Sequence, residues 1–109
     1  MKNKLTFERE YANLKSLFTT RSFETAENLV TRMLKDYNVF DYDLLLKRAR
    51  IRQCLMRYED ALVDSSLALS VSPELSDAYL VVSDCLIATQ RLSEAAKLLE
   101  IMHLKEPNN

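Results

Sequence analysis

The sequence contains no glycine and only two prolines, and the lack of glycine limits both its chemistry and its turns. Phosphate-binding loops of the P-loop and dinucleotide types need glycine, because their backbone must approach the phosphates closely. We therefore expect neither kind of nucleotide site. Tight turns between helices often need a residue with positive φ, and a residue other than glycine adopts that conformation at a cost of roughly 1 kcal/mol.

Residue types that carry catalysis and metal binding are also scarce. The single histidine, His103, has no second histidine or cysteine near it in the sequence, so it makes a poor metal site. The serines between Ser65 and Ser72 have no general base in register with them. We therefore expect no enzymatic activity, no catalytic residue, no metal site and no cofactor.

Long apolar runs are absent as well. No stretch approaches the roughly 18 uninterrupted apolar residues that a membrane span needs. The N-terminal segment Met1–Glu8 reaches charged residues before an apolar run develops, unlike a secretory signal. Cys54 and Cys85 lack metal-ligand spacing and fall within helical patterns, so we interpret both as buried, reduced thiols of a cytoplasmic or nuclear protein.

Charge of one sign does not dominate the chain. Charged residues make up 28% of the sequence, yet the net charge is −1, which argues against nucleic-acid or membrane-surface binding. The balance shifts along the chain, because residues 1–38 carry 7 Lys and Arg against 5 Asp and Glu, whereas residues 74–109 carry 3 against 6. We expect this gradient to orient a partner or a neighbouring copy.

One motif recurs three times: a large residue, two further residues and then alanine. It occupies Phe23–Ala26, Tyr58–Ala61 and Leu92–Ala95, so that the alanines lie 35 and 34 residues apart. Twelve residues before the second and third alanines stand Ala49 and Ser83, which are small enough for two helices to approach closely, and a proline follows each alanine by twelve residues. A nearly constant period of this kind indicates internal repeats.

The pattern resembles the tetratricopeptide repeat over nearly the whole chain. It is clearest in the second and third repeats, because in the first repeat Leu14 replaces the small residue and Asn38 the proline. The resemblance implies an all-α fold, an α-solenoid of three repeats at about 7–40, 41–74 and 75–107 within a single domain, 1–109. The expected helices span about 5–20, 23–36, 42–55, 58–71, 75–89 and 92–105.

The resemblance also leads to expectations about the turns and the last helix. Where this family usually places glycine within a repeat, the chain has Arg21, Met56 and Gln90, so we expect either strained left-handed residues or turns of another type. The family usually adds a polar capping helix after its last repeat, and we expect none here. Ile101 and Leu104 would then form an apolar interface on the last helix, for self-association or for a partner.

In this family the first helix of each pair lines a concave groove that holds an extended or helical segment. The resemblance therefore implies a non-enzymatic adaptor that binds a peptide of a partner protein. The implied groove residues are Tyr11, Lys15, Phe18, Leu46, Lys47, Arg50, Gln53, Leu80, Asp84 and Ile87. This mixture suits an amphipathic segment, and Lys15, Lys47 and Arg50 suit an acidic group on it.

The local sequences are also similar to chaperone-adaptor tetratricopeptide domains. That subfamily clamps a C-terminal carboxylate with two lysines, two asparagines and a further arginine or lysine. At the matching positions this chain has Tyr11, Lys15, Lys47, Asp77 and Val81. The clamp is not preserved, and Asp77 would repel the carboxylate.

The basic run Lys47–Arg52 leaves two interpretations open. On a helix its charges point around more than half of the circumference, which favours Arg48 and Arg52 packed between helices and paired with Asp60 or Asp64. The other interpretation is a phosphate-binding patch. It belongs to an alternative function, a structural subunit docked in a large assembly such as a ribonucleoprotein through this patch and the last helix.

Overall fold

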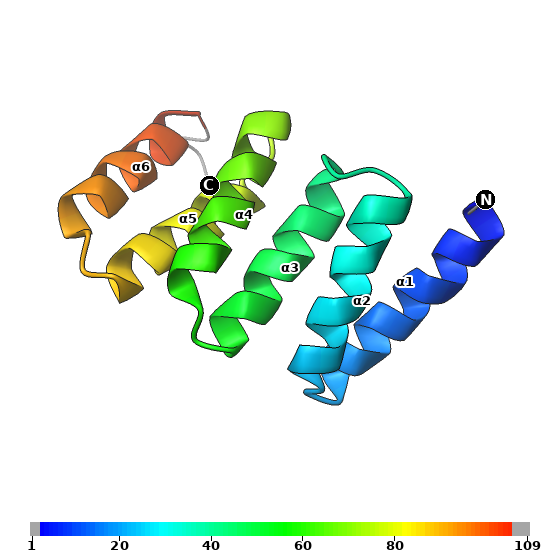
Figure 1. Ribbon diagram of the computed structural model, residues 1–109. Helices are drawn as coiled ribbons and strands as arrows, with labels where there is room; N and C mark the ends of the chain where they lie inside the picture. The colour runs from blue at the N-terminus through cyan, green and yellow to red at the C-terminus, as the bar shows by residue number, and fades with distance from the viewer. Residues whose placement is uncertain (1–2, 106–109) are drawn as a thin grey trace.

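The computed structural model describes residues 3–105, and these residues form six α-helices with no strand among them (Figure 1). The helices are α1 (Lys4–Thr19), α2 (Phe23–Asp36), α3 (Tyr42–Cys54), α4 (Tyr58–Val71), α5 (Asp77–Ala88) and α6 (Leu92–Lys105). The predicted all-α fold is confirmed, and every helix boundary lies within 2 residues of its expected position. The expected lack of a capping helix concerns residues 106–109, which lie outside the described part of the chain.

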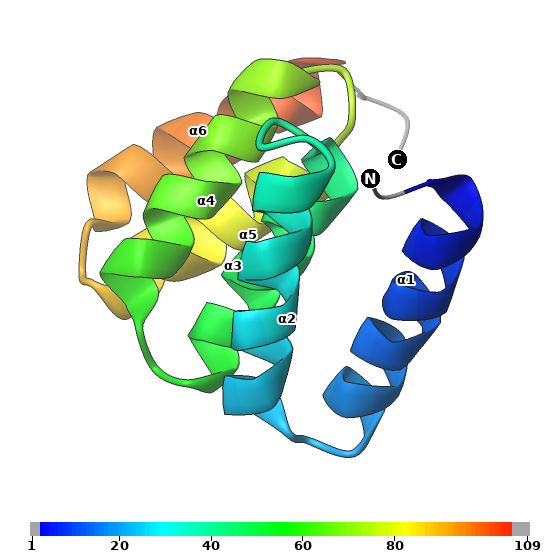
Figure 2. The same cartoon turned by 45° about the vertical axis from the view of Figure 1, so that its right-hand side comes forward.

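The helices form three antiparallel pairs that stack side by side. The first helices are α1, α3 and α5, and the second helices are α2, α4 and α6. Figure 2 shows α2, α4 and α6 in succession across one face, with α3 and α5 behind them. The stack is elongated, with extents of 42 × 26 × 21 Å. Each pair thus buries its apolar face against its neighbour, as a solenoid does.

Small residues allow the helices to cross closely. Ala26, Ala49 and Ala61 are fully buried, and Ala95 and Ser83 are nearly so. These residues are the recurring alanines and the small residues that precede them by twelve. Larger apolar side chains fill the space around them, and the core extends from the first pair to the third.

The turn within each pair contains one residue in the left-handed conformation. Arg21, Met56 and Gln90 have φ of 62°, 61° and 63°, so the first of the two expected alternatives holds. The next residue in each turn donates its N–H to the carbonyl five residues earlier, as Ser22 does to Leu17 at 2.8 Å. This bond satisfies a carbonyl at the end of the first helix, which offsets part of the backbone strain.

The two cysteines lie in different environments. Cys85 is buried as expected, and burial raises the pKa of its thiol to about 11. The expectation was wrong for Cys54, which is exposed. It lies one helical turn after Arg50, on the face of α3 that is open to solvent. None of the helices in residues 3–105 is long and apolar enough to cross a membrane.

Replacing Met56 with glycine is expected to stabilise the protein. Glycine adopts a φ of 61° without a Cβ clash, and the Met56 side chain is 75% exposed, so its loss removes little packing. The matched control is Met56→Ala, which shortens the side chain but keeps the Cβ. Urea unfolding should give Met56→Gly a free energy of unfolding about 0.5–1 kcal/mol above that of Met56→Ala. Equal stability of the two variants would contradict the strain.

Candidate functional site

A pocket between α1 and α3 brings four of the predicted groove residues together. Its volume is about 240 Å³. The predicted residues are Lys15, Phe18, Lys47 and Arg50, and Leu14, Thr19 and Ile51 complete the lining. Leu14 and Ile51 are buried, so they give the pocket an apolar floor, while Lys15 and Arg50 are exposed at its rim.

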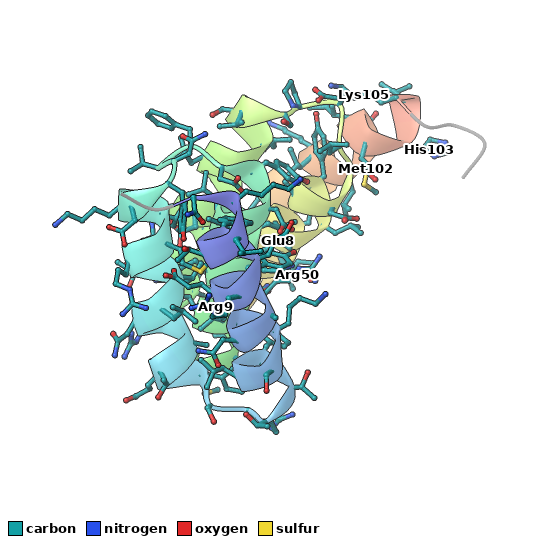
Figure 3. All side chains as sticks on the ribbon, turned by 90° about the vertical axis from the view of Figure 1, so that its right-hand side faces the viewer. Glu8, Arg9, Arg50, Met102, His103 and Lys105 are labelled. Atoms are coloured by element: carbon teal, nitrogen blue, oxygen red, sulfur yellow. The ribbon has the colours of Figure 1, made fainter. Side chains whose placement is uncertain are left out.

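Helical spacing explains why these side chains share one face. On α1, Tyr11, Lys15 and Phe18 are separated by four and three residues, and on α3 Lys47 and Arg50 are separated by three. Residues at such intervals lie one above the other on a helix. Figure 3 shows Arg50 on the side of α1 that faces away from α2.

Tyr11 links the two helices at one end of the pocket. Its hydroxyl donates a hydrogen bond to Asp43, whose other carboxylate oxygen lies 3.2 Å from the Lys47 ammonium. The ammonium groups of Lys15 and Lys47 lie 5.5 and 5.1 Å from the centre of the Tyr11 ring, which places each within cation–π range. Burial alone lowers the pKa of Lys47, but the Tyr11 hydroxyl and the Asp43 carboxylate raise it overall. Lys47 therefore stays charged at neutral pH.

The cations of the pocket differ in what they contact. Lys47 is partly neutralised by Asp43, whereas Lys15 and Arg50 make no ion pair with any residue that the structure describes. Two positive charges thus remain available above the apolar floor. The pocket can hold an acidic group beside an apolar side chain.

The α5 part of the groove has the opposite character. Leu80, Asp84 and Ile87 are exposed, and their spacing of four and three residues puts them on one face of α5. Asp84, like Asp77 one helix turn before Leu80, forms no ion pair within residues 3–105. This surface is apolar and acidic, in contrast to the basic pocket between α1 and α3.

The structure places the other predicted groove residues less uniformly. Gln53 and Tyr11 are half-buried, and Gln53 lines a second hollow with Phe18, Arg50, Cys54 and Tyr58. Leu46 is only 5% exposed and belongs to the core beneath the groove, so it is not open to a ligand. The resemblance placed Leu46 in the groove, but Leu44, Leu45 and Leu46 are all buried, so this turn of α3 is covered on more than one face.

Sequence reasoning missed the apolar residues of the pocket. Leu14 and Ile51 each lie one residue from a groove cation, Lys15 and Arg50 respectively. One step along a helix turns the side chain by about 100°, so these neighbours point toward the floor of the pocket. A search for large apolar residues adjacent to the groove positions would have found them.

Residues Lys47–Arg52 do not form a basic patch. Lys47 and Arg50 line the pocket, whereas Arg48 and Arg52 pack against α2 and α4. Arg48 binds Asp64 through two hydrogen bonds of 2.9 and 2.8 Å, and a third, from Arg52 to Asp64, is 2.8 Å long. Asp64 is 1% exposed, so the predicted pairing with Asp64 is confirmed, and it leaves Arg48 and Arg52 bound to carboxylates rather than open to phosphate.

This buried carboxylate belongs to a larger ion network at the junction of the first and second helix pairs. Arg52 also donates to Glu27 at 2.9 Å, and Arg57 donates to the other oxygen of Glu27 at 2.6 Å. Burial alone raises the pKa of Glu27, but the two guanidinium groups lower it overall. The network joins α2, α3 and α4 on the side away from the pocket.

The equivalent junction between the second and third pairs is apolar where the first is charged, and it keeps only the exposed Arg91–Glu59 ion pair among the described residues. The position equivalent to Glu27 lies 35 residues later in the sequence, and those equivalent to Arg48, Arg52 and Asp64 lie 34 residues later. These equivalent residues are Leu62, Val82, Leu86 and Leu98. An open groove of about 400 Å³ remains there between α4, α5 and α6. Its wall includes Ile101 of the predicted C-terminal interface.

Among the described residues, no three histidine, cysteine, aspartate or glutamate side chains gather in a way that would hold a metal ion.

Comparison with models of protein families and with curated protein sequences finds no match.

Solved structures do resemble the chain. The TPR2B domain of yeast Sti1, solved as its pHsp70 complex, superposes with a TM-score of 0.83 at 24% identity, over 91% of this chain and 78% of that one. The TPR2AB domain of yeast Sti1, in a pHSP90 complex, gives 0.86 at 24% identity, over 95% of this chain and 40% of that one. The first TPR of Spaghetti (RPAP3), bound to the HSP90 peptide SRMEEVD, gives 0.86 at 23% identity, over 98% and 84%. The chain therefore has the tetratricopeptide fold, a solenoid of three helix pairs.

Removing the Asp64 carboxylate is expected to destabilise the stack. Asp64→Asn leaves the guanidinium groups of Arg48 and Arg52 without their shared anion, and loss of one partner of a buried ion pair costs about 3 kcal/mol. The exposed Asp60, one helix turn earlier on α4, provides the control Asp60→Asn, which should change stability by no more than about 0.5 kcal/mol. Thermal and urea unfolding test this, and equal effects of both variants would contradict the network.

Proposed function

We propose that the chain is a non-enzymatic adaptor that binds a peptide segment of a partner protein in the groove formed by α1, α3 and α5. The observation that carries this proposal is the pocket between α1 and α3, where Lys15, Lys47 and Arg50 surround an apolar floor. Such a site suits an amphipathic segment with an acidic group. The similar solved structures are complexes with pHsp70, pHSP90 or an HSP90 peptide, which supports a peptide as the class of ligand. A chaperone-related role in the cytoplasm or nucleus is consistent with them.

The proposal does not extend to clamping a C-terminal carboxylate in the manner of the chaperone-adaptor subfamily. Asp77 is exposed at one clamp position and brings a negative charge to it. Val81, at another, is buried and has no charge. The positive charge of this groove is concentrated on α1 and α3 instead. An acidic group within the partner segment fits that distribution better than a chain end held across all three helices.

Nucleic acid is a poorer match for the same surface. Arg48 and Arg52 are occupied by Asp64 and Glu27, and Lys47 is partly neutralised by Asp43. Few cations therefore remain to contact a row of phosphates. Salt dependence separates the two classes of partner, because phosphate contacts lose affinity steeply with salt, whereas binding of an amphipathic peptide falls gently.

Reversing two cations of the pocket is expected to weaken partner binding without unfolding the domain. Lys47→Glu with Arg50→Glu should lower the affinity for a groove-bound peptide by about tenfold or more, because an attractive contact becomes repulsive. The double variant Arg32→Glu with Lys35→Glu makes the same change in charge on exposed positions of α2.

Peptides selected from a random display library against the full chain provide the ligands, and calorimetric titration measures their affinities. Both double variants should retain the helical circular dichroism of the wild type, since surface charge changes shift stability by only about 0.5 kcal/mol. Equal affinities of the two variants would refute the groove assignment, as would a failure to select any peptide.

The alternative function, docking as a structural subunit in a large assembly, is favoured by one specific observation. Ile101 and Leu104 are 46% and 72% exposed on α6, and the apolar groove of about 400 Å³ adjoins Ile101. An apolar surface of this kind marks an interface for a partner or for a second copy. The Lys47–Arg52 segment adds little support to this alternative, because Arg48 and Arg52 are bound by Asp64 and Glu27.

Two lysines on α6 test this interface. Ile101→Lys with Leu104→Lys should leave a folded chain that stays monomeric and loses any partner bound at this face. The control Leu5→Lys with Leu75→Lys changes exposed apolar residues elsewhere and should behave as wild type. Sedimentation at several concentrations, with partner binding alongside, decides the question. A wild-type chain that is monomeric, and binds its partner as well with both α6 lysines present, would leave the interface without support.

A further inference from the structure

We infer that the groove recognises a peptide segment that carries both a negative and a positive charge. Its acidic side chain lies at Lys15 and Arg50, and its basic side chain lies at Asp84. A large apolar side chain between them enters the pocket between α1 and α3. This inference rests on the peptide-binding function proposed above and adds the charge order and spacing of the ligand. It follows from three features of the groove: unpaired charge, apolar surface and distance.

The unpaired charges of the groove are separated by sign. On α1 and α3, Lys15 and Arg50 form no ion pair with a described residue, while the acidic Asp43 is already bound by Tyr11 and Lys47. On α5 the exposed Asp84 forms no ion pair either. Asp43, which would otherwise neutralise Lys15 and Arg50, is thus already bound, whereas Asp84 is available to a basic group of the ligand.

Apolar surface accompanies both charged regions. Beside Lys15 and Arg50 lies the pocket floor of Leu14 and Ile51, with a volume of about 240 Å³. On α5, Leu80 and Ile87 are exposed on either side of Asp84. A ligand therefore gains apolar contact next to each of its charged groups, where water is partly displaced and an ion pair is stronger than at an open surface.

The distance between the two regions sets the spacing in the ligand. Packed neighbouring helices lie about 8–10 Å apart, and an extended chain advances about 3.3 Å per residue. A segment that crosses from the pocket at α3 to Asp84 on α5 thus spans roughly three residues, and side-chain reach extends this to five. We therefore expect acidic and basic residues about three to five positions apart.

The charge order is tested with peptides selected from a random display library. Peptides of about twelve residues are long enough to cross all three first helices at about 3.3 Å per residue. Selection uses the wild-type chain, and the enriched sequences should carry an acidic residue, a large apolar residue and a basic residue with the spacing given above. Selection on Asp84→Lys should replace the basic residue with an acidic or neutral one.

Compensating changes then locate each contact. Arg50→Glu should reduce the affinity of a selected peptide about three- to tenfold, and exchanging the acidic residue of the peptide for lysine should restore it. In the second pair of changes, Asp84→Lys should reduce the affinity of the peptide, and exchanging the basic residue of the peptide for glutamate should restore it. Asp60→Lys, on an exposed position of α4, is the control and should change neither affinity.

The outcomes separate this inference from the function on which it rests. Enriched peptides with the expected charge order, together with rescue in both pairs, support it. Peptides that lose affinity with Lys47→Glu and Arg50→Glu but show no charge order, or no rescue at Asp84, overturn the inference and leave peptide binding intact. If no selected peptide depends on Lys47 and Arg50, both proposals are refuted.

Discussion

The close crossing of the two helices in each pair is the constraint on which the rest of the structure depends. In the second pair, buried Ala49 and Ala61 leave no room between the helices for a larger side chain, whereas in the first pair Ala26 is the small residue and buried Leu14 stands at the position of Ala49. Because the crossings recur at nearly constant intervals, successive pairs meet in similar ways and their first helices line up side by side. The pocket between α1 and α3 exists only because this alignment holds Lys15 and Arg50 over one apolar floor.

The ion network contributes to the site from the opposite side of α3. Arg48 and Arg52 are held by Asp64 and Glu27, which keeps their guanidinium groups on the side of α2 and α4. Arg50 lies between them in the sequence, and its side chain is turned toward the pocket. One basic segment therefore serves two purposes, because alternate positions on a helix face different directions. The charge that a partner meets is smaller than the sequence alone indicates.

Much of the fold was predictable from the sequence because it repeats. The recurring alanines defined the register, and from the register followed the helix boundaries and the turn positions Arg21, Met56 and Gln90. Whether these residues are left-handed or the turns are of another type stayed open until the structure showed positive φ at all three. The site was predictable only in part. Register assigns a residue to a face of its helix, but the tilt of neighbouring helices decides how deeply that face is covered. For this reason Leu46 lies in the core, contrary to expectation, although it precedes Arg50 by one turn. Cys54, also expected to be buried, is exposed because it follows Arg50 by one turn on the face of α3 that is open to solvent.

The two junctions between helix pairs also make the repeats non-interchangeable. The first is closed by ion pairs of Glu27 with Arg52 and Arg57, next to the buried Asp64, whereas the second presents Leu62, Val82, Leu86 and Leu98 at positions equivalent to Glu27, Arg48, Arg52 and Asp64. If the third pair were stacked on the first, Glu27 would meet Leu86 in place of Arg52, and Arg91, at the position of Arg57, would be its one remaining cation. Arg52 would in turn lose Glu27, but Arg48 and Arg52 would keep Asp64, which lies on α4 of their own pair. The native order of the three pairs is thus favoured by the chemistry of the contacts between them.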